Sequence, residues 1–316
     1  PEEKKAIERR GTDNAEAHNL YLMARQTYVN SHDIDPRASE AIVRLCKRAT
    51  QIDPEYAQAW TLMAIGYRKL REAHGGTSDE GMAAAERALE LDPNLAEAHA
   101  IKAQLLLGDG DAEAAATEVA VALEFDPDSY EVNRSAGRLN YQLHRLEEAT
   151  RFYEKAAALM KADLNSASIL ISCYTALGDA AGSRRAAELA LERAEAVLQH
   201  DQNNSMVAGY SAYALAALGE GERAKARMQR ALLIDPDNFN MRYNFGCALC
   251  MYLQDKEAAL DMLGPIFETI TDTFLPYAKA DPDLELLHDD PRYIEMVAAA
   301  EARLAKSEEE QDSESD

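Results

Sequence analysis

The sequence is poor in basic residues. Of its 316 residues, 33 are Lys or Arg and 56 are Asp or Glu, which gives a formal net charge of −23. Nucleic acids are bound through phosphate groups that need a basic protein surface, and an anionic membrane would repel so acidic a chain. We therefore expect neither a nucleic acid nor a membrane as a partner.

Long hydrophobic runs and paired cysteines are also missing. No stretch approaches the ~18 consecutive apolar residues of a membrane-spanning helix, and the charged first ten residues contain no apolar segment typical of a signal peptide. Four scattered Cys are too few for the disulfide framework of a secreted domain. These absences favour a cytoplasmic location. Because the chain starts at Pro1, we expect residues 1–13 to be a linker from a missing upstream domain.

Recognisable catalytic motifs are absent from the sequence. There is no Gly-rich phosphate loop, no G-x-S-x-G nucleophile motif and no H-E-x-x-H metal motif. We therefore expect no catalytic residues and no cofactor in this chain. A metal- or ligand-dependent enzyme remains the least favoured alternative.

One cysteine pair has the spacing of a zinc site. Cys247 and Cys250 would lie on one face of a helix, but a structural zinc ion needs four ligands. The nearest further candidate in the sequence is the single residue His288. The favoured interpretation is that both thiols pack inside the protein, so no metal site is predicted.

Alanine is abundant and Thr, Val and Phe are sparse, a balance that favours helices over strands. An Asp-Pro pair preceded by an apolar residue recurs along the chain, and from Pro93 to Pro127 the spacing is 34 residues. The pairs are Asp53-Pro54, Asp92-Pro93, Asp126-Pro127 and Asp235-Pro236. A period of 34 residues is that of the tetratricopeptide repeat (TPR).

The pattern inside each unit resembles the same family. The family places small residues where its two helices cross, and in unit 57–93 such places hold Ala64, Gly81 and Ala88. The resemblance implies an all-α fold, a right-handed TPR superhelix of about seven helix pairs over residues 14–270. An irregular helical bundle would not keep this register, because only stacked repeats require it.

The C-terminal part departs from the repeat. Two Asp-Pro helix starts predict short helices at about 283–288 and 291–305, so we expect residues 271–306 to cap the array. Residues 307–316 carry six carboxylates and no apolar residue, which predicts a disordered acidic tail. In the preceding unit, Pro265 predicts that the second helix begins or kinks there.

Both ends carry a narrower resemblance. The stretch Arg9 to Ala17 with Leu20 to Arg25, and the segments Asp281 to Leu284 and Asp289 to Tyr293, resemble the TPR region of bacterial adenylate or guanylate cyclase-like and winged-helix regulatory proteins. Members of that family carry a catalytic or DNA-binding domain upstream. The resemblance implies that the chain is the regulatory C-terminal part of a larger bacterial signalling protein.

The family resemblance also implies a binding surface. In TPR proteins the concave face is lined by the second, fifth, ninth and twelfth places of each unit. Here these places hold Tyr21, Arg25, Tyr28, Thr61, Ile65, Arg68, Arg134, Arg138, Tyr141, Asn165, Ser168, Ser172, Tyr213, Asn240 and Tyr243. Tyr, Asn, Ser and Arg side chains suit an extended peptide, so we expect a protein or peptide partner. Self-association into a homo-oligomer is the second possibility.

The two arginines at the centre of this lining have two interpretations. Arg134 and Arg138 could attract a carboxylate of a ligand, because they lie in the least acidic part of the predicted lining. They could equally pair with neighbouring acids such as Glu131 on a solvated helix face. In either case we expect neither side chain to be needed for the stacking of the helices.

Overall fold

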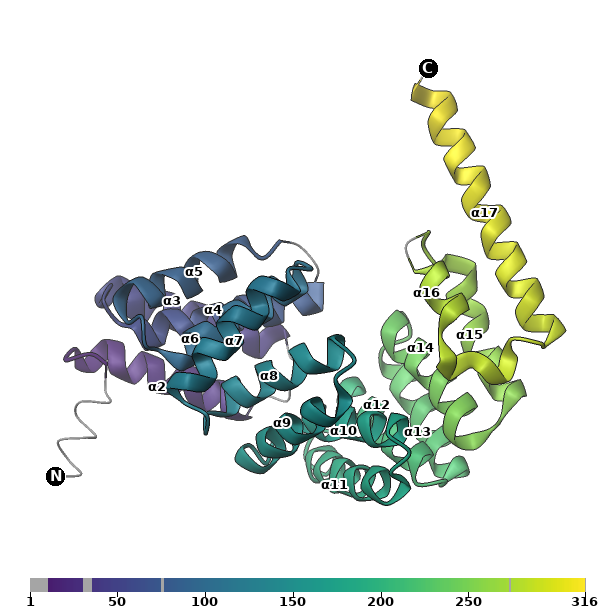
Figure 1. Cartoon of the computed structure of the whole chain (residues 1–316), viewed down its shortest axis with the longest axis horizontal. Coiled ribbons are helices and arrows are strands. Elements are labelled where there is room, and N and C mark those ends of the chain that lie inside the picture. The colour runs from purple at the N-terminus through teal and green to yellow at the C-terminus, as the bar shows by residue number, and fades with distance from the viewer. Residues whose placement is uncertain (1–10, 31–35, 75–76, 273, 316) are drawn as a thin grey trace. The chain divides into compact units, whose positions relative to one another are not determined.

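A computed structural model describes residues 11–30, 36–74, 77–272 and 274–315 (Figure 1). Every regular element in these ranges is a helix, as the alanine-rich composition predicts. The chain divides into two compact units, with the boundary between Ala180 and Ala181. No helix in the described ranges combines the length and the apolar character needed to cross a bilayer.

The first unit is built from consecutive helices that pack in pairs: α2 with α3, α4 with α5, α6 with α7 and α8 with α9. A further helix, α10, packs on α9. Their bounds are α2 Ala15–Asn30, α3 Pro36–Ile52, α4 Ala57–His74, α5 Asp79–Leu91, α6 Ala96–Gly108, α7 Ala112–Phe125, α8 Tyr130–Gln142, α9 Leu146–Leu159 and α10 Leu164–Ala176.

The second unit continues the pairing and ends in a different way. Helix α12 packs on α13, and α14 packs on α15. The bounds are α11 Ala180–Leu198, which begins at the unit boundary, then α12 Ser205–Ala217, α13 Gly221–Ile234, α14 Phe239–Ala248, the π-helix η1 Leu249–Leu253, α15 Lys256–Thr269, α16 Leu275–Ala280, the 3-10 helix η2 Pro282–Leu287 and α17 Pro291–Ser315.

The Asp-Pro pairs separate one helix pair from the next. Asp92 has an extended backbone, which the following proline favours, and its N–H closes helix α5 by donating to the carbonyl of Ala88. Its carboxylate then accepts the N–H of Asn94 at 3.1 Å. Asp126 ends helix α7 in the same way. The motif therefore stops one helix and positions the next.

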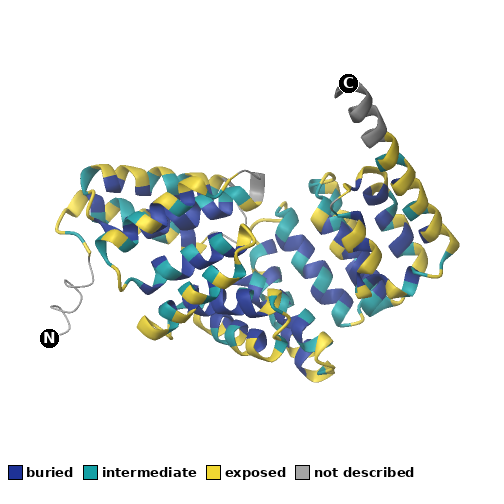
Figure 2. Cartoon of the chain, turned by 45° about the horizontal axis from the view of Figure 1, so that its top comes forward, coloured by how far each residue is buried: buried dark blue, intermediate teal, exposed yellow. Residues whose placement is uncertain are grey.

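Small residues occupy the helix crossings, as the repeat predicts. Ala85 and Ala88 are fully buried in α5, and Ala224 and Ala231 are fully buried in α13. Buried residues lie on the faces that the helices turn toward one another, and exposed residues lie on the outer faces (Figure 2). The all-α repeat fold of helix pairs is confirmed.

Several predicted boundaries differ from the structure. Helix α15 does not begin at Pro265 but runs through it from Lys256, because the side chain of Asp255 caps the helix by accepting the N–H of Ala258 at 3.1 Å. The capping segment contains one more helix than expected, α16, before η2. Helix α17 was expected to end near 305 and continues to Ser315, where a disordered tail was predicted; its Ala, Glu and Gln residues are strong helix formers. Residues 1–10 of the predicted linker lie outside the described residues.

Candidate functional site

The first helices of successive pairs in the first unit lie against one another. Helix α4 contacts α2 and α6, and α6 contacts α8. Polar side chains from these four helices meet and form what we call the inner cluster. Its members are Arg25, Tyr28, Arg68, Lys69, Glu72, Glu97, Gln104, Glu131, Arg134 and Arg138.

One end of the inner cluster is rich in cations. Each carboxylate oxygen of Glu72 forms an ion pair with a different arginine. Oε2 lies 2.6 Å from Arg68 Nη1, and Oε1 lies 2.6 Å from Arg138 Nη1. Burial alone would raise the pKa of Glu72, but attraction to Arg68, Arg138 and Arg134 outweighs it and lowers the pKa to about 2. Three guanidinium groups thus act on one carboxylate. We call this part of the cluster the arginine end.

The arginine end is largely withdrawn from solvent. Arg68 is 2 % exposed and Arg134 is 7 % exposed, whereas the side chain of Arg138 is 30 % exposed. Arg134 Nη1 donates to Oε1 of the buried Gln104 at 3.5 Å. Among the described residues, the buried Nε of Arg68 has no hydrogen-bond partner. Because buried positive charge is costly without compensation, an anionic group that arrives beside Arg138 would be favoured.

The opposite end of the inner cluster is rich in carboxylates. Arg25 Nη2 lies 3.3 Å from Glu97 Oε1, and the hydroxyl of Tyr28 donates to Glu131. Lys69 Nζ lies 4.8 Å from the centroid of the Tyr28 ring. Burial and the nearby Glu131 carboxylate raise the pKa of Glu97, although Arg25 opposes the shift. These carboxylates repel a further anion. An anionic ligand is therefore favoured at the arginine end instead.

These contacts revise both interpretations of the central arginines. Arg138 pairs with Glu72, which lies two repeats earlier on α4, so it is not simply paired within its own helix. Arg138 and Arg134 tie α8 to α4 and to α6. Both arginines thus contact residues of other repeats, and the expectation that neither side chain is needed for the stacking of helices stays a prediction.

The remaining predicted lining residues of the first unit fall into two groups. Tyr21 packs on Tyr56 with ring centroids 5.2 Å apart, and burial raises the pKa of Tyr21, so this ring belongs to the core. Tyr141 on α8 is 37 % exposed. On α10, Ser168 is buried and its hydroxyl has no hydrogen-bond partner among the described residues. Of the others, Thr61 and Ile65 are buried, and Asn165 and Ser172 are partly exposed.

The sequence-based list missed several members of the inner cluster. Glu97 and Gln104 occupy the second and ninth places of unit 96–127, and Glu131 occupies the second place of unit 130–161. The register that selected the arginines therefore also selects these residues. Glu72 and Lys69 fall outside those places, and only the three-dimensional packing reveals them.

In the second unit the predicted lining residues have other surroundings. Tyr213 meets Tyr252 edge to face, and their hydroxyl oxygens lie 3.2 Å apart. Asn240 is exposed. Tyr243 is only 4 % exposed and donates to Asp281 Oδ2 at 2.7 Å. The expectation that Tyr243 lines an open groove does not fit this burial, because the capping segment that contains Asp281 covers it.

The thiols lie beside the same carboxylate. Donor atoms of Cys247, Asp281 and Asp283 lie within 4.8 Å of one another and are the residues that could hold a metal ion. Asp281 is already engaged, because it accepts hydrogen bonds from Tyr243 and from the N–H of Asp283. Burial raises the pKa of Cys247, and it raises the pKa of Cys250 to about 12. Neutral, packed thiols remain our prediction for this pair.

Known proteins resemble this chain in fold rather than in sequence. No protein-family model matches the chain, and no curated protein matches it. Among solved structures, the Cut9–Hcn1 hetero-tetramer of APC/C is similar, with 13 % identity over 92 % of this chain and a TM-score of 0.55. The chain has the tetratricopeptide-repeat fold.

A second similar structure is a human IFIT1 dimer with PPP-AAAA, with 14 % identity over 86 % of this chain and 69 % of that one, and a TM-score of 0.51. The chain spans about half, 49 %, of the Cut9 chain it matches. At these identities the likeness establishes the TPR fold.

Proposed function

We propose that this TPR protein is a non-catalytic interaction scaffold that binds a protein segment through a carboxylate at the arginine end. The observation that carries the proposal is the contact of Arg68 and Arg138 with the single carboxylate of Glu72, with Arg134 close enough to help lower the pKa of that carboxylate. The whole chain has a net charge of −23, so this local reversal of charge is a distinguishing feature of its inner surface.

The chemistry suits a carboxylate ligand. A guanidinium group donates through a planar fork that matches the two oxygens of a carboxylate. Arg138, the most exposed of the three, provides access, while the buried Arg68 provides a fixed positive charge. The partly exposed ring of Tyr141, one helical turn from Arg138, offers contact for an apolar side chain of the ligand.

The resemblance at the two ends of the chain suggests the larger protein to which it belongs. We propose that the chain serves as the regulatory C-terminal part of a bacterial signalling protein, located in the cytoplasm, with a protein rather than a nucleic acid as its partner. The acidic composition supports this choice, because a polyanion would be repelled by most of the surface.

A peptide-display selection tests the proposal. Peptides are selected on the full chain, and the tightest one is measured against the parent, Arg138→Ala and Arg223→Ala. Arg223 is a matched control because it is an exposed arginine that also forms an ion pair, with Glu220, but lies on α13. We expect selected peptides to carry carboxylates, and Arg138→Ala to weaken binding at least tenfold, because a charge-assisted hydrogen bond contributes ~1.5–3 kcal/mol.

The Arg223→Ala variant should bind like the parent. Replacing the carboxylates of the selected peptide by amides should reproduce the loss seen for Arg138→Ala. Selection of peptides without carboxylates, or unchanged binding by Arg138→Ala, would refute the proposed site.

A further inference from the structure

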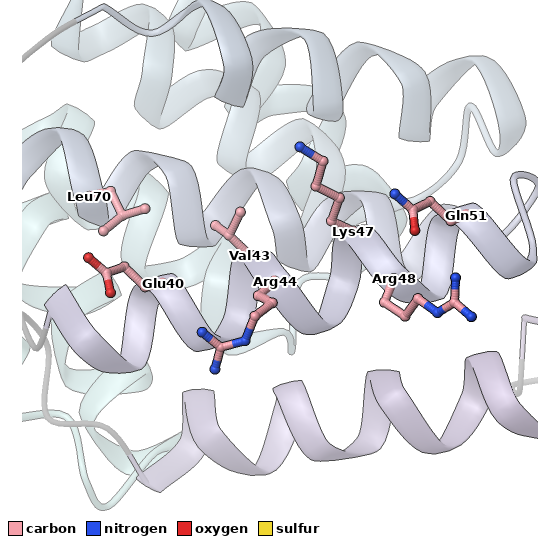
Figure 3. Close-up of a pocket in the computed structure, with 7 residues that line it drawn as sticks. All are labelled: Glu40, Val43, Arg44, Lys47, Arg48, Gln51 and Leu70. Atoms are coloured by element: carbon pink, nitrogen blue, oxygen red, sulfur yellow. The ribbon is translucent and has the colours of Figure 1, made fainter.

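Helix α3 presents a shallow groove with an unusual charge. The groove has a volume of about 440 Å³. Its lining residues are Glu40, Val43, Arg44, Lys47, Arg48, Gln51 and Leu70, and we call it the α3 groove. In Figure 3 Arg44, Lys47 and Arg48 come from one helix, with Lys47 extending to one side of it, as Val43 does, and Arg44 and Arg48 extending to the other. All three cations are exposed.

The structure gives these three cations no internal role. Within the described ranges, none of Arg44, Lys47 and Arg48 forms a side-chain ion pair or hydrogen bond. Helix α13 is also rich in basic residues, but each of its cations has a partner. The pairs are Arg223 with Glu220, Lys225 with Asp255, Arg227 with Glu195, and Arg230 with Asn203.

We propose that the α3 groove binds the acidic C-terminal segment, residues 307–316, of a second copy of the chain. That segment carries six carboxylates and no cation, so it is the part of the sequence most complementary to the groove. A nucleic acid fits less well, because three cations on one helix face are too few for the ~6–10 phosphate contacts of a typical nucleic-acid site.

If two copies each place their C-terminal segment in the α3 groove of the other, two weak contacts together hold the dimer. A single ion pair between exposed groups contributes little, but reciprocal exchange makes both tail contacts at once. Such a two-fold arrangement is closed, so it stops at a dimer, and the second contact forms within an existing complex. The association should weaken with salt, because the charges involved are exposed.

Light scattering after size-exclusion chromatography tests the proposal on the full chain. We expect a dimer whose population rises with protein concentration at 50 mM NaCl and falls at least tenfold at 500 mM NaCl. The groove variant carries Arg44→Glu, Lys47→Glu and Arg48→Glu. The tail variant carries Glu308→Gln, Glu309→Gln and Glu310→Gln. Each should be monomeric under both conditions.

A control variant with the same change in net charge distinguishes an effect of the groove from an effect of the total charge. The variant Arg184→Glu, Arg223→Glu and Arg230→Glu alters three exposed arginines outside the groove and should still dimerise. Circular dichroism checks that each variant folds, and Ala replacements at the three groove positions serve if the Glu variant does not.

Three results would overturn the proposal: a parent chain that is monomeric at every concentration, a tail variant that still dimerises, or a control that loses the dimer as fully as the groove variant. Binding of a labelled 307–316 peptide by a chain that stays monomeric would also overturn it, since the tail would then contact its own chain. The peptide-binding test at Arg138 is independent of all these outcomes.

Discussion

The two units use the same repeat register for different purposes. On the first helices of the pairs, the first unit carries the charged inner cluster around Glu72. In the second unit, Tyr243 at a corresponding place meets Phe274 edge to face at 5.1 Å and bonds to Asp281. Fully buried alanines such as Ala88 and Ala231 hold the helix crossings in both units. The repeat thus fixes the crossings, while the inner positions form a charged cluster in the first unit and pack against a cap in the second.

The largest expected effect lies in the first unit. Replacing Glu72→Gln should lower the free energy of unfolding by ~2–4 kcal/mol at pH 7, because it removes the carboxylate shared by Arg68, which is buried, and Arg138. Urea denaturation of the parent and the variant measures the difference. A loss below ~0.5 kcal/mol, the range of ordinary surface substitutions, would show that the charges of the arginine end are solvated.

The pH dependence of the same variant sharpens the test. The folded pKa of Glu72 is about 2, below its ordinary value of 4.5. A carboxyl group with a lowered folded pKa stabilises the protein above its unfolded pKa, and this contribution is lost as the pH falls through the folded pKa. The parent should therefore lose its advantage over Glu72→Gln progressively below about pH 4.5.

The shared feature of the two units should respond equally in both. Ala88→Leu and Ala231→Leu each insert a larger side chain at a fully buried helix crossing. Overpacking of this kind costs ~1–3 kcal/mol, which calorimetry of each variant measures. If one of the two were neutral, the units would not share the crossing geometry.

A smaller loss is expected where the second unit joins its cap. Tyr243→Phe removes the O–H that donates to the buried Asp281 carboxylate and should cost ~1–2 kcal/mol. The matched control is Tyr277→Phe, because Tyr277 is mostly exposed and its change should be near zero. Equal effects of the two substitutions would mean that Tyr243 does not hold the cap.

The smallest expected effect is a gain in stability. Burial and the neighbouring Asp281 raise the pKa of Asp283 to about 6. A carboxyl group with a raised folded pKa reduces stability above that pKa, and the cost disappears below its unfolded pKa near 3.8. Asp283→Asn should therefore stabilise the protein by up to ~1 kcal/mol at pH 8, an amount reduced by solvent screening. The melting temperatures of parent and variant should converge near pH 4, and no gain at pH 8 would contradict this account.

The sequence predicts the repeat because local rules determine it. The Asp-Pro pairs and the small residues at crossings are visible within one unit, and the structure confirms the helix pairs they imply. Of the two alternatives for Pro265, a helix start is wrong, because α15 already begins at Lys256, where Asp255 caps it; a kink at Pro265 stays a prediction. The acidic composition of residues 307–316 predicts disorder, a prediction that gives too little weight to helix propensity, since α17 continues to Ser315.

The candidate site was predictable only in part. The repeat register selected Arg68, Arg134 and Arg138, and in the structure Arg68 and Arg138 contact Glu72 while Arg134 bonds to Gln104. Their shared partner Glu72 was missed, because contacts between different repeats depend on how closely the helices stack. The burial of Tyr243 was missed because it depends on Asp281, 38 residues away.

Hydrogen–deuterium exchange of the full chain, with and without the peptide selected by display, tests the central claim most directly. If the arginine end is the binding site, the peptide should slow exchange in α4, α6 and α8 and leave α14, α15 and α17 unchanged. The same experiment with Arg138→Ala should show no protection at equal peptide concentration. Protection confined to α14, α15 and α17, or to α3, in the parent would contradict the claim.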